Sequence, residues 1–166
     1  SYLNTIFLLV GAIYSKDKWR IAIPLIFLSL KDLLQGLSYN NIKKGKSTQF
    51  LTSMSWIHLC LQPLFVNVFF SHFDKTFKYW NHVFVLCILY ALYDITNLNE
   101  FDIQNDEDCI KKDKHDDFCS KETESYIGKY HLGYKFSTDE SSSWMIYRLL
   151  MFLPALFTKS KYIGIG

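Results

Sequence analysis

Five apolar segments separated by polar stretches constrain the fold of this 166-residue chain more than any other feature. A helix needs about 20 apolar residues to cross a bilayer, and the second, third and fourth segments approach or exceed that length. A segment that spans lipid must be helical, because each backbone polar group needs an internal partner there. The sequence therefore predicts an all-α fold: a multi-pass transmembrane helix bundle of about five spans with one long polar loop. The segments are residues 2–14, 19–42, 50–71, 79–97 and 141–158.

The long polar loop divides the chain into three parts. We expect residues 1–97 to hold the first four transmembrane helices, residues 98–140 to form an acidic outer loop, and residues 141–166 to hold the fifth helix and a tail. Of the 16 acidic residues, 12 lie between positions 100 and 140, a stretch without a helix or strand period. No nucleic-acid motif accompanies the basic residues, so we expect no nucleic-acid partner.

Two cysteines in the polar loop, Cys109 and Cys119, are candidates for a disulfide. Such a bond would close a small loop and stabilise it by about 2–3 kcal/mol. It requires an oxidising compartment, which agrees with a loop outside the cytosol or matrix. The alternative is two unpaired thiols, because spacing alone does not establish pairing.

The distribution of Lys and Arg predicts the orientation of the bundle. Alternating spans place most basic residues of the short loops on one side, and the positive-inside rule makes this the inner side. The acidic loop then lies outside. A short basic loop on the outer side, with Lys43, Lys44 and Lys46, opposes this assignment. The residues of the inner side are Lys16, Lys18, Arg20, Lys75, Lys78, Lys159 and Lys161.

Polar side chains inside the apolar segments form a candidate stripe near the middle of the membrane. Ionisable residues in membrane helices are costly and mark candidate functional sites. Counted from the outer ends, Asp32 and His58 fall at similar depths, and Asp94 and Arg148 both fall in the outer half. The functional interpretation is a proton or ion path or a binding site. The alternative is interhelical hydrogen bonding that fixes packing, with about 1 kcal/mol for each bond. The candidate residues are Asp32, Gln35, His58, Gln62, Asp94 and Arg148.

No complete catalytic or metal-binding pattern accompanies this stripe. Zinc needs convergent ligands, and none of the histidines is followed by another four residues later on one helix face. Nucleophile-elbow, P-loop, dinucleotide-binding and CxxC motifs are also absent from the sequence. We therefore expect no catalytic residues, no metal and no cofactor beyond bound lipids.

Four runs of sequence carry a family resemblance: residues 28–39, 50–65, 128–134 and 151–156. The first holds Gln35, the second His58 and Gln62, and the third His131. Together they resemble an uncharacterised family of multi-pass membrane proteins from giant viruses and microbial eukaryotes. The family pattern has an acid just before its Leu-Gln pair, and Asp32 is the nearest match. The resemblance implies a membrane bundle with a cysteine-bearing outer loop, and it implies no activity.

These patterns favour a non-catalytic accessory or structural subunit of a larger membrane complex. We expect other membrane subunits and lipids as partners. An organellar inner membrane, such as that of the mitochondrion with its respiratory assemblies, would expose the loop to an oxidising space. The alternative is a stand-alone transporter, channel or receptor-like protein that uses the polar stripe.

Overall fold

The computed structural model describes residues 2–97, 119–127, 132–137 and 142–157. This part of the chain holds five α-helices and a two-stranded antiparallel sheet, so the prediction of a mostly helical chain is confirmed. Each helix matches a predicted apolar segment to within two residues at either end. The elements are α1 (Tyr2–Tyr14), α2 (Trp19–Lys43), α3 (Gln49–Phe73), α4 (Trp80–Asn97), β1 (Cys119–Ile127), β2 (Leu132–Ser137) and α6 (Ser142–Phe157).

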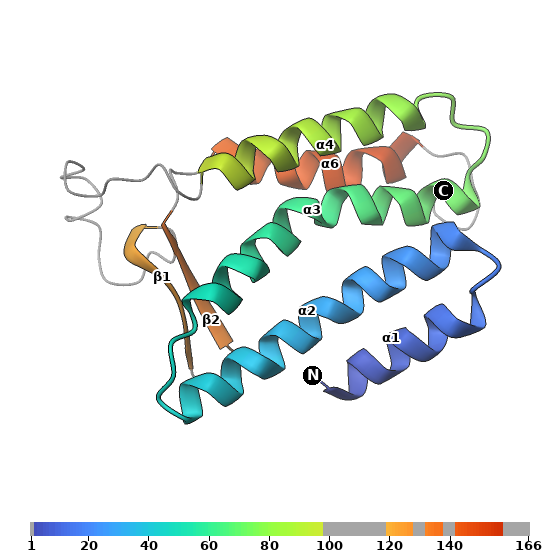
Figure 1. Cartoon of the computed structure of the whole chain (residues 1–166). Coiled ribbons are helices and arrows are strands. Elements are labelled where there is room, and N and C mark those ends of the chain that lie inside the picture. Colours follow the sequence, from blue (N-terminus) through green and yellow to red (C-terminus); the bar gives the residue numbers. More distant parts are fainter. Residues whose placement is uncertain (1, 98–118, 128–131, 138–141, 158–166) are drawn as a thin grey trace.

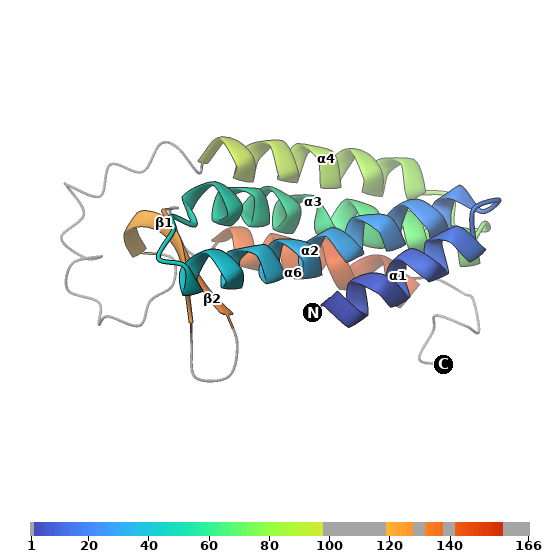
Figure 2. The ribbon, with the colours of Figure 1, turned by 60° about the horizontal axis from the view of Figure 1, so that its bottom comes forward.

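Helix α3 is the central element of the bundle. Helices α1, α2 and α3 lie side by side in chain order, while α4 and α6 pack together against α3 (Figures 1 and 2). The two strands pack against the N-terminal half of α3, beside the C-terminal end of α2. The bundle therefore has two different ends, one covered by the sheet and one formed by the turns that follow α1 and α3.

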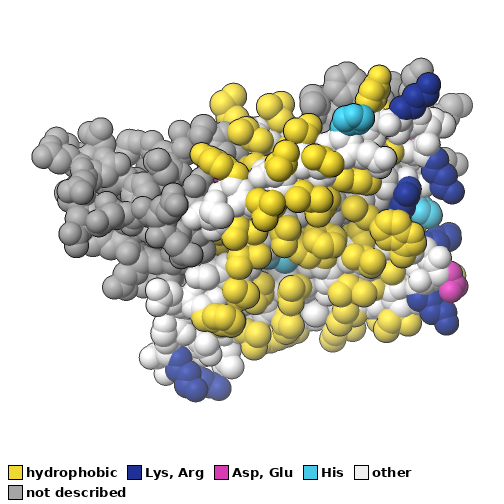
Figure 3. Space-filling view, turned by 45° about the horizontal axis from the view of Figure 1, so that its top comes forward, with side chains coloured by type: hydrophobic (Ala, Val, Ile, Leu, Met, Phe, Trp, Pro, Cys, Tyr) yellow, Lys and Arg dark blue, Asp and Glu magenta, His cyan; other side chains and the backbone are white. Residues whose placement is uncertain are grey.

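Small polar side chains take a large share of the buried positions in the bundle, beside a small apolar core around Trp56, Cys60 and Ala91. Small polar side chains such as Thr52 and Asn67 are fully buried, while large apolar side chains such as Phe7 and Leu89 are 66% and 58% exposed. Hydrophobic side chains cover the middle of the molecule, and Lys and Arg gather at its ends (Figure 3). Small and polar residues at helix contacts, with apolar residues outside, are typical of membrane helices.

Helices α2 and α3 are long and apolar enough to cross a membrane. Each has 25 residues, which corresponds to about 37 Å against a hydrocarbon thickness of about 30 Å. Helices α1 and α4 are apolar but shorter. Five spans therefore stay a prediction, while two candidate spans are a feature of the structure.

The expectation of an all-α fold with an irregular polar loop is wrong at β1 and β2. Residues 119–127 and 132–137 pair antiparallel, with Tyr126 opposite Gly133 and Ser125 opposite Tyr134. The second strand carries a period-two signal, because Leu132, Tyr134 and Phe136 alternate with smaller or polar residues. The end of the Tyr126 ring lies over Gly133, so a Cβ atom at position 133 would require this ring to move.

The predicted disulfide cannot be placed, because Cys109 lies outside the described residues. Its pairing with Cys119 stays a prediction. The thiols of Cys60 and Cys87 are free and buried in the bundle. Both pack in helix contacts, where a small thiol behaves as an apolar side chain.

Candidate functional site: the polar interior of the bundle

His58 is part of the contact between α2 and α3. Its ring stacks on that of Phe27 at a centroid distance of 4.0 Å, and Phe27 stacks in turn on Phe65 at 3.9 Å. The His58 Nε2 atom lies 2.9 Å from the Phe27 carbonyl oxygen. A carbonyl oxygen only accepts, so this contact requires Nε2 to carry the proton and leaves Nδ1 as an acceptor.

Asp32 lies on a different face of α2 from the one that meets His58. It is seven residues after Leu25 and four before Gly36, and both of these positions pack against α1. Residues at such spacings share one helix face, which directs Asp32 towards the α1 side. Asp32 is half-buried and makes no hydrogen bond or ion pair with a described residue. The structure thus does not bring Asp32 and His58 together.

Gln35 belongs to the contact between the helices and the sheet. The hydroxyl group of Tyr134 in β2 lies close to the side chains of Gln35 and Ser55, whose hydrogen bonding acts to lower its pKa. Burial raises the pKa of the Tyr134 hydroxyl, and these two hydrogen bonds oppose that rise. Gln35 is therefore engaged by a strand that the sequence analysis did not predict.

A second set of hydrogen bonds fixes β1 on α3. The Ser125 backbone N–H donates to Thr48 Oγ1 at 3.0 Å, and the hydroxyl oxygens of Ser125 and Thr52 are 2.6 Å apart. All three residues are buried. The sheet thus covers the polar N-terminal end of α3 through specific bonds.

Gln62 and Asn67 connect α3 to α6. The Tyr147 hydroxyl donates to Gln62 Oε1 at 3.0 Å. The Asn67 Nδ2 group donates to the Pro63 carbonyl at 2.8 Å and to the Leu150 carbonyl at 2.7 Å. These bonds hold the two helices in one register.

The Leu150 carbonyl is free to accept a hydrogen bond from Asn67 because of the proline that follows it in α6. In an α-helix the carbonyl of residue 150 would receive the N–H of residue 154, but residue 154 is proline and has none. Asn67 supplies the missing donor from the neighbouring helix. Its own Oδ1 is buried without a hydrogen-bond partner among the described residues, and rotating the amide would place oxygen against two carbonyls.

Asp94 and Arg148 do not form the ion pair that their similar depth allows. Asp94 is buried at 2% exposure, and its backbone carbonyl accepts a hydrogen bond from Trp56 Nε1 at 3.1 Å. Arg148 is exposed on α6 and makes no ion pair with a described residue. The position of a residue along its helix predicts its depth in the membrane but not the side of the helix from which its side chain projects. Asp94 and Arg148 share a depth but project from sides that do not face each other.

The predicted stripe is therefore divided among separate helix contacts. His58, Asn67 and Trp56 all donate to backbone carbonyls, which is packing chemistry. Among the described residues, no group of three or more His, Cys, Asp or Glu side chains is placed to hold a metal ion. Of the candidate residues, Asp32 and Arg148 are the two that take no part in these contacts.

Comparisons with known proteins give one match. The model of a family of unknown function, DUF5765, matches residues 6–163. No curated protein and no solved structure matches the chain.

Proposed function

The chain belongs to the DUF5765 family, whose function is unknown, and we propose that it is an integral membrane protein that serves as a non-catalytic subunit of a larger membrane complex. The observation that carries this proposal is the exposure of two cations, Lys31 and Arg148, in the apolar helices. Neither makes a hydrogen bond or ion pair with a described residue.

The position of Lys31 makes contact with lipid alone costly. It lies 12 residues from each end of α2, which places it about 18 Å from either end. A charged residue at the centre of a membrane helix costs about 2.5–3.5 kcal/mol. A partner helix with a carboxylate or other acceptor at the same depth would remove that cost.

The buried polar groups support a structural rather than a catalytic role. They join α2, α3, α4 and α6 through bonds to backbone carbonyls. The exposed apolar faces of α1 and α4, with residues such as Phe7 and Leu89, supply the area for helix contacts. We extend the proposal to five spans, with the sheet on the outer side of an organellar inner membrane such as the mitochondrial one.

The test is the native mass of the chain extracted in mild detergent from its own membranes. We expect an assembly much larger than the 19.6 kDa chain. Lys31→Leu and Arg148→Leu should release the folded chain from it, because each removes a buried charge contact with a partner. Lys46→Leu, in the exposed loop between α2 and α3, is the control and should leave the mass unchanged.

Two results contradict this proposal. One is a wild-type chain that runs as a monomer. The other is that Lys31→Leu and Arg148→Leu both keep the native mass of the wild type and unfold at a higher detergent concentration than the wild type. That result would show that both cations face lipid.

A stand-alone transporter or channel is the second candidate, and Asp32 is the observation that favours it. This carboxylate is half-buried at the contact of α1 and α2 without a described partner. After reconstitution into vesicles, Asp32→Asn should abolish an ion or proton flux, whereas Asp17→Asn in the exposed turn should not. A flux that is absent, or unchanged by Asp32→Asn, removes this candidate.

A further inference from the structure

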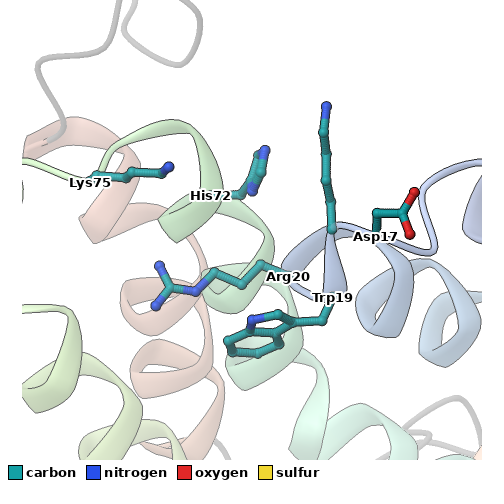
Figure 4. Close-up of a pocket in the computed structure, with 6 residues that line it drawn as sticks. Asp17, Trp19, Arg20, His72 and Lys75 are labelled. Atoms are coloured by element: carbon teal, nitrogen blue, oxygen red, sulfur yellow. The ribbon is translucent and has the colours of Figure 1, made fainter.

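A basic cleft lies at the end of the bundle away from the sheet. It forms where the turn between α1 and α2 meets the C-terminal end of α3, and its volume is about 420 Å³. Figure 4 shows its side chains extending from these two places in the chain. The residues that line it are Asp17, Lys18, Trp19, Arg20, His72 and Lys75.

The charges in the cleft favour an anion. Lys18, Arg20 and Lys75 all lie close enough to act electrostatically on His72. The single carboxylate of the lining, that of Asp17, points away from Arg20 and His72 (Figure 4). Three cations thus face one small volume against one carboxylate at its margin.

Arg20 is held in place to bind a planar or tetrahedral anion. Its guanidinium carbon lies 5.2 Å from the centre of the Trp19 ring, and its Nη1 donates to the Ser71 carbonyl at 3.3 Å. A guanidinium group has five N–H donors, so most stay available after this contact. Because Arg20 is already positioned, it loses little side-chain freedom on binding a phosphate oxygen.

Two exposed lysines complete the lining of the cleft. Lys18 and Lys75 are exposed, and their side-chain ammonium groups make no hydrogen bond or ion pair with a described residue. They come from segments 57 residues apart in the chain, and only the pairing of α2 with α3 brings them together. Each adds a point charge that can follow a phosphate group.

We propose that this cleft binds the phosphate of an anionic phospholipid headgroup at the inner surface of the membrane. The inference rests on the membrane placement proposed above. Figure 3 shows Lys and Arg side chains beside the exposed apolar surface at the ends of the molecule, and the cleft is lined by three such cations, at the level where headgroups would lie. Trp19, 56% exposed at its edge, is the amphipathic aromatic expected at that level. Basic pockets between membrane helices are known to bind phosphate headgroups, whereas a soluble phosphate compound would not need an adjoining apolar surface.

The experiment measures lipid binding by the full chain in detergent with native mass spectrometry. Phosphatidylglycerol is compared with phosphatidylcholine, and inorganic phosphate is added in a lipid-free sample. The test variant is Lys18→Gln/Lys75→Gln, which leaves the Arg20 contacts intact. Its matched control is Lys44→Gln/Lys46→Gln, which removes the same charge from exposed positions at the opposite end.

We expect phosphatidylglycerol to bind more tightly than phosphatidylcholine. Each cation near a lipid surface contributes about fivefold in affinity, so the test variant should lose about 25-fold while the control keeps wild-type affinity. An equal loss in both double variants, or no preference for phosphatidylglycerol, overturns the site. Inorganic phosphate that binds as tightly as the lipid overturns the lipid assignment in favour of a free phosphate.

Failure of the membrane placement is distinguishable from failure of the cleft. Vesicles that contain the reconstituted chain are washed with alkaline carbonate. A chain that is washed off contradicts the membrane proposal itself. A chain that stays in the membrane but shows no headgroup preference contradicts the cleft alone.

Discussion

Replacing Asn67 with leucine tests how the buried polar groups stabilise the bundle. The substitution removes the donor that reaches the Leu150 carbonyl at 2.7 Å while nearly keeping the side-chain volume. Interhelical hydrogen bonds in membrane proteins contribute about 0.6 kcal/mol on average and about 1.7 kcal/mol at most. The Leu150 carbonyl has no donor in its own helix, because Pro154 lacks an N–H group, so we expect a loss of about 1.5 kcal/mol. For a chain of this length that corresponds to a fall of about 3–6 °C in Tm.

The assay is reversible unfolding by sodium dodecyl sulfate in mixed micelles, followed by circular dichroism. Asn81→Leu, the same change at an exposed position of α4, is the control and should have little effect. The decisive variant is Asn67→Leu/Pro154→Ala, because alanine restores an N–H group that can bind the Leu150 carbonyl. We expect the second change to recover about 1 kcal/mol of the loss.

The reasoning is refuted if the two substitutions are additive to within about 0.5 kcal/mol, which is the usual limit for independent sites. It is also refuted if Asn67→Leu stabilises the chain. That result would mean that the unpartnered Oδ1 of Asn67 costs more than the bonds donated by its Nδ2 group contribute.

Three further predictions concern the contacts of α1 and of the sheet. Gly36→Ala should destabilise the chain by about 1 kcal/mol at most, because its Cβ would lie 2.8 Å from the tip of the Tyr2 ring and this side chain, 53% exposed, can shift; Tyr2→Ala should remove the loss in the unfolding assay. Ser125→Val removes the hydroxyl contact with Thr52, so β1 should become cleavable by protease, while circular dichroism should show unchanged helices. Equal protection of the wild type and the variant from protease would contradict the role of this contact in holding β1 on α3. Because burial raises the pKa of Tyr134, the contribution of this group to stability should be complete below pH of about 10 and should fall as the pH rises through the raised pKa. The difference in absorbance at 295 nm between wild type and Tyr134→Phe would report that titration, and a midpoint at or below the ordinary pKa of about 10 would contradict it.

Sequence reasoning predicted the helices well and the sheet poorly. Long apolar segments are a strong signal, and the five helices follow them to within two residues. The strands are a weak signal, because β1 is rich in polar residues and only β2 alternates strictly. The alternation of Leu132, Tyr134 and Phe136 is the local signal of a strand in the loop, and it is too short to predict that β2 pairs with β1.

The candidate stripe shows the limit of arguments from depth. Their similar depth predicts that His58 and Asp32 meet, yet His58 faces α2 while Asp32 lies on the side of α2 that faces α1. Gln35 and Gln62 bind Tyr134 and Tyr147, which lie 99 and 85 residues away in the chain. Which side chains meet depends on how each helix is rotated about its own axis. A comparison of residue depths gives no information on that rotation.

The sequence by itself determined where the helices begin and end, because the length and polarity of each segment are local properties. It also places proline at position 154, which removes the N–H group that would otherwise bind the Leu150 carbonyl. Only the tertiary structure decided that Asn67 is this donor, that the sheet covers Gln35 and Thr52, and that Lys18 and Lys75 share one cleft. The physical reason is that these contacts join segments far apart in the chain, and the packing of whole helices, not any local preference, sets their distances.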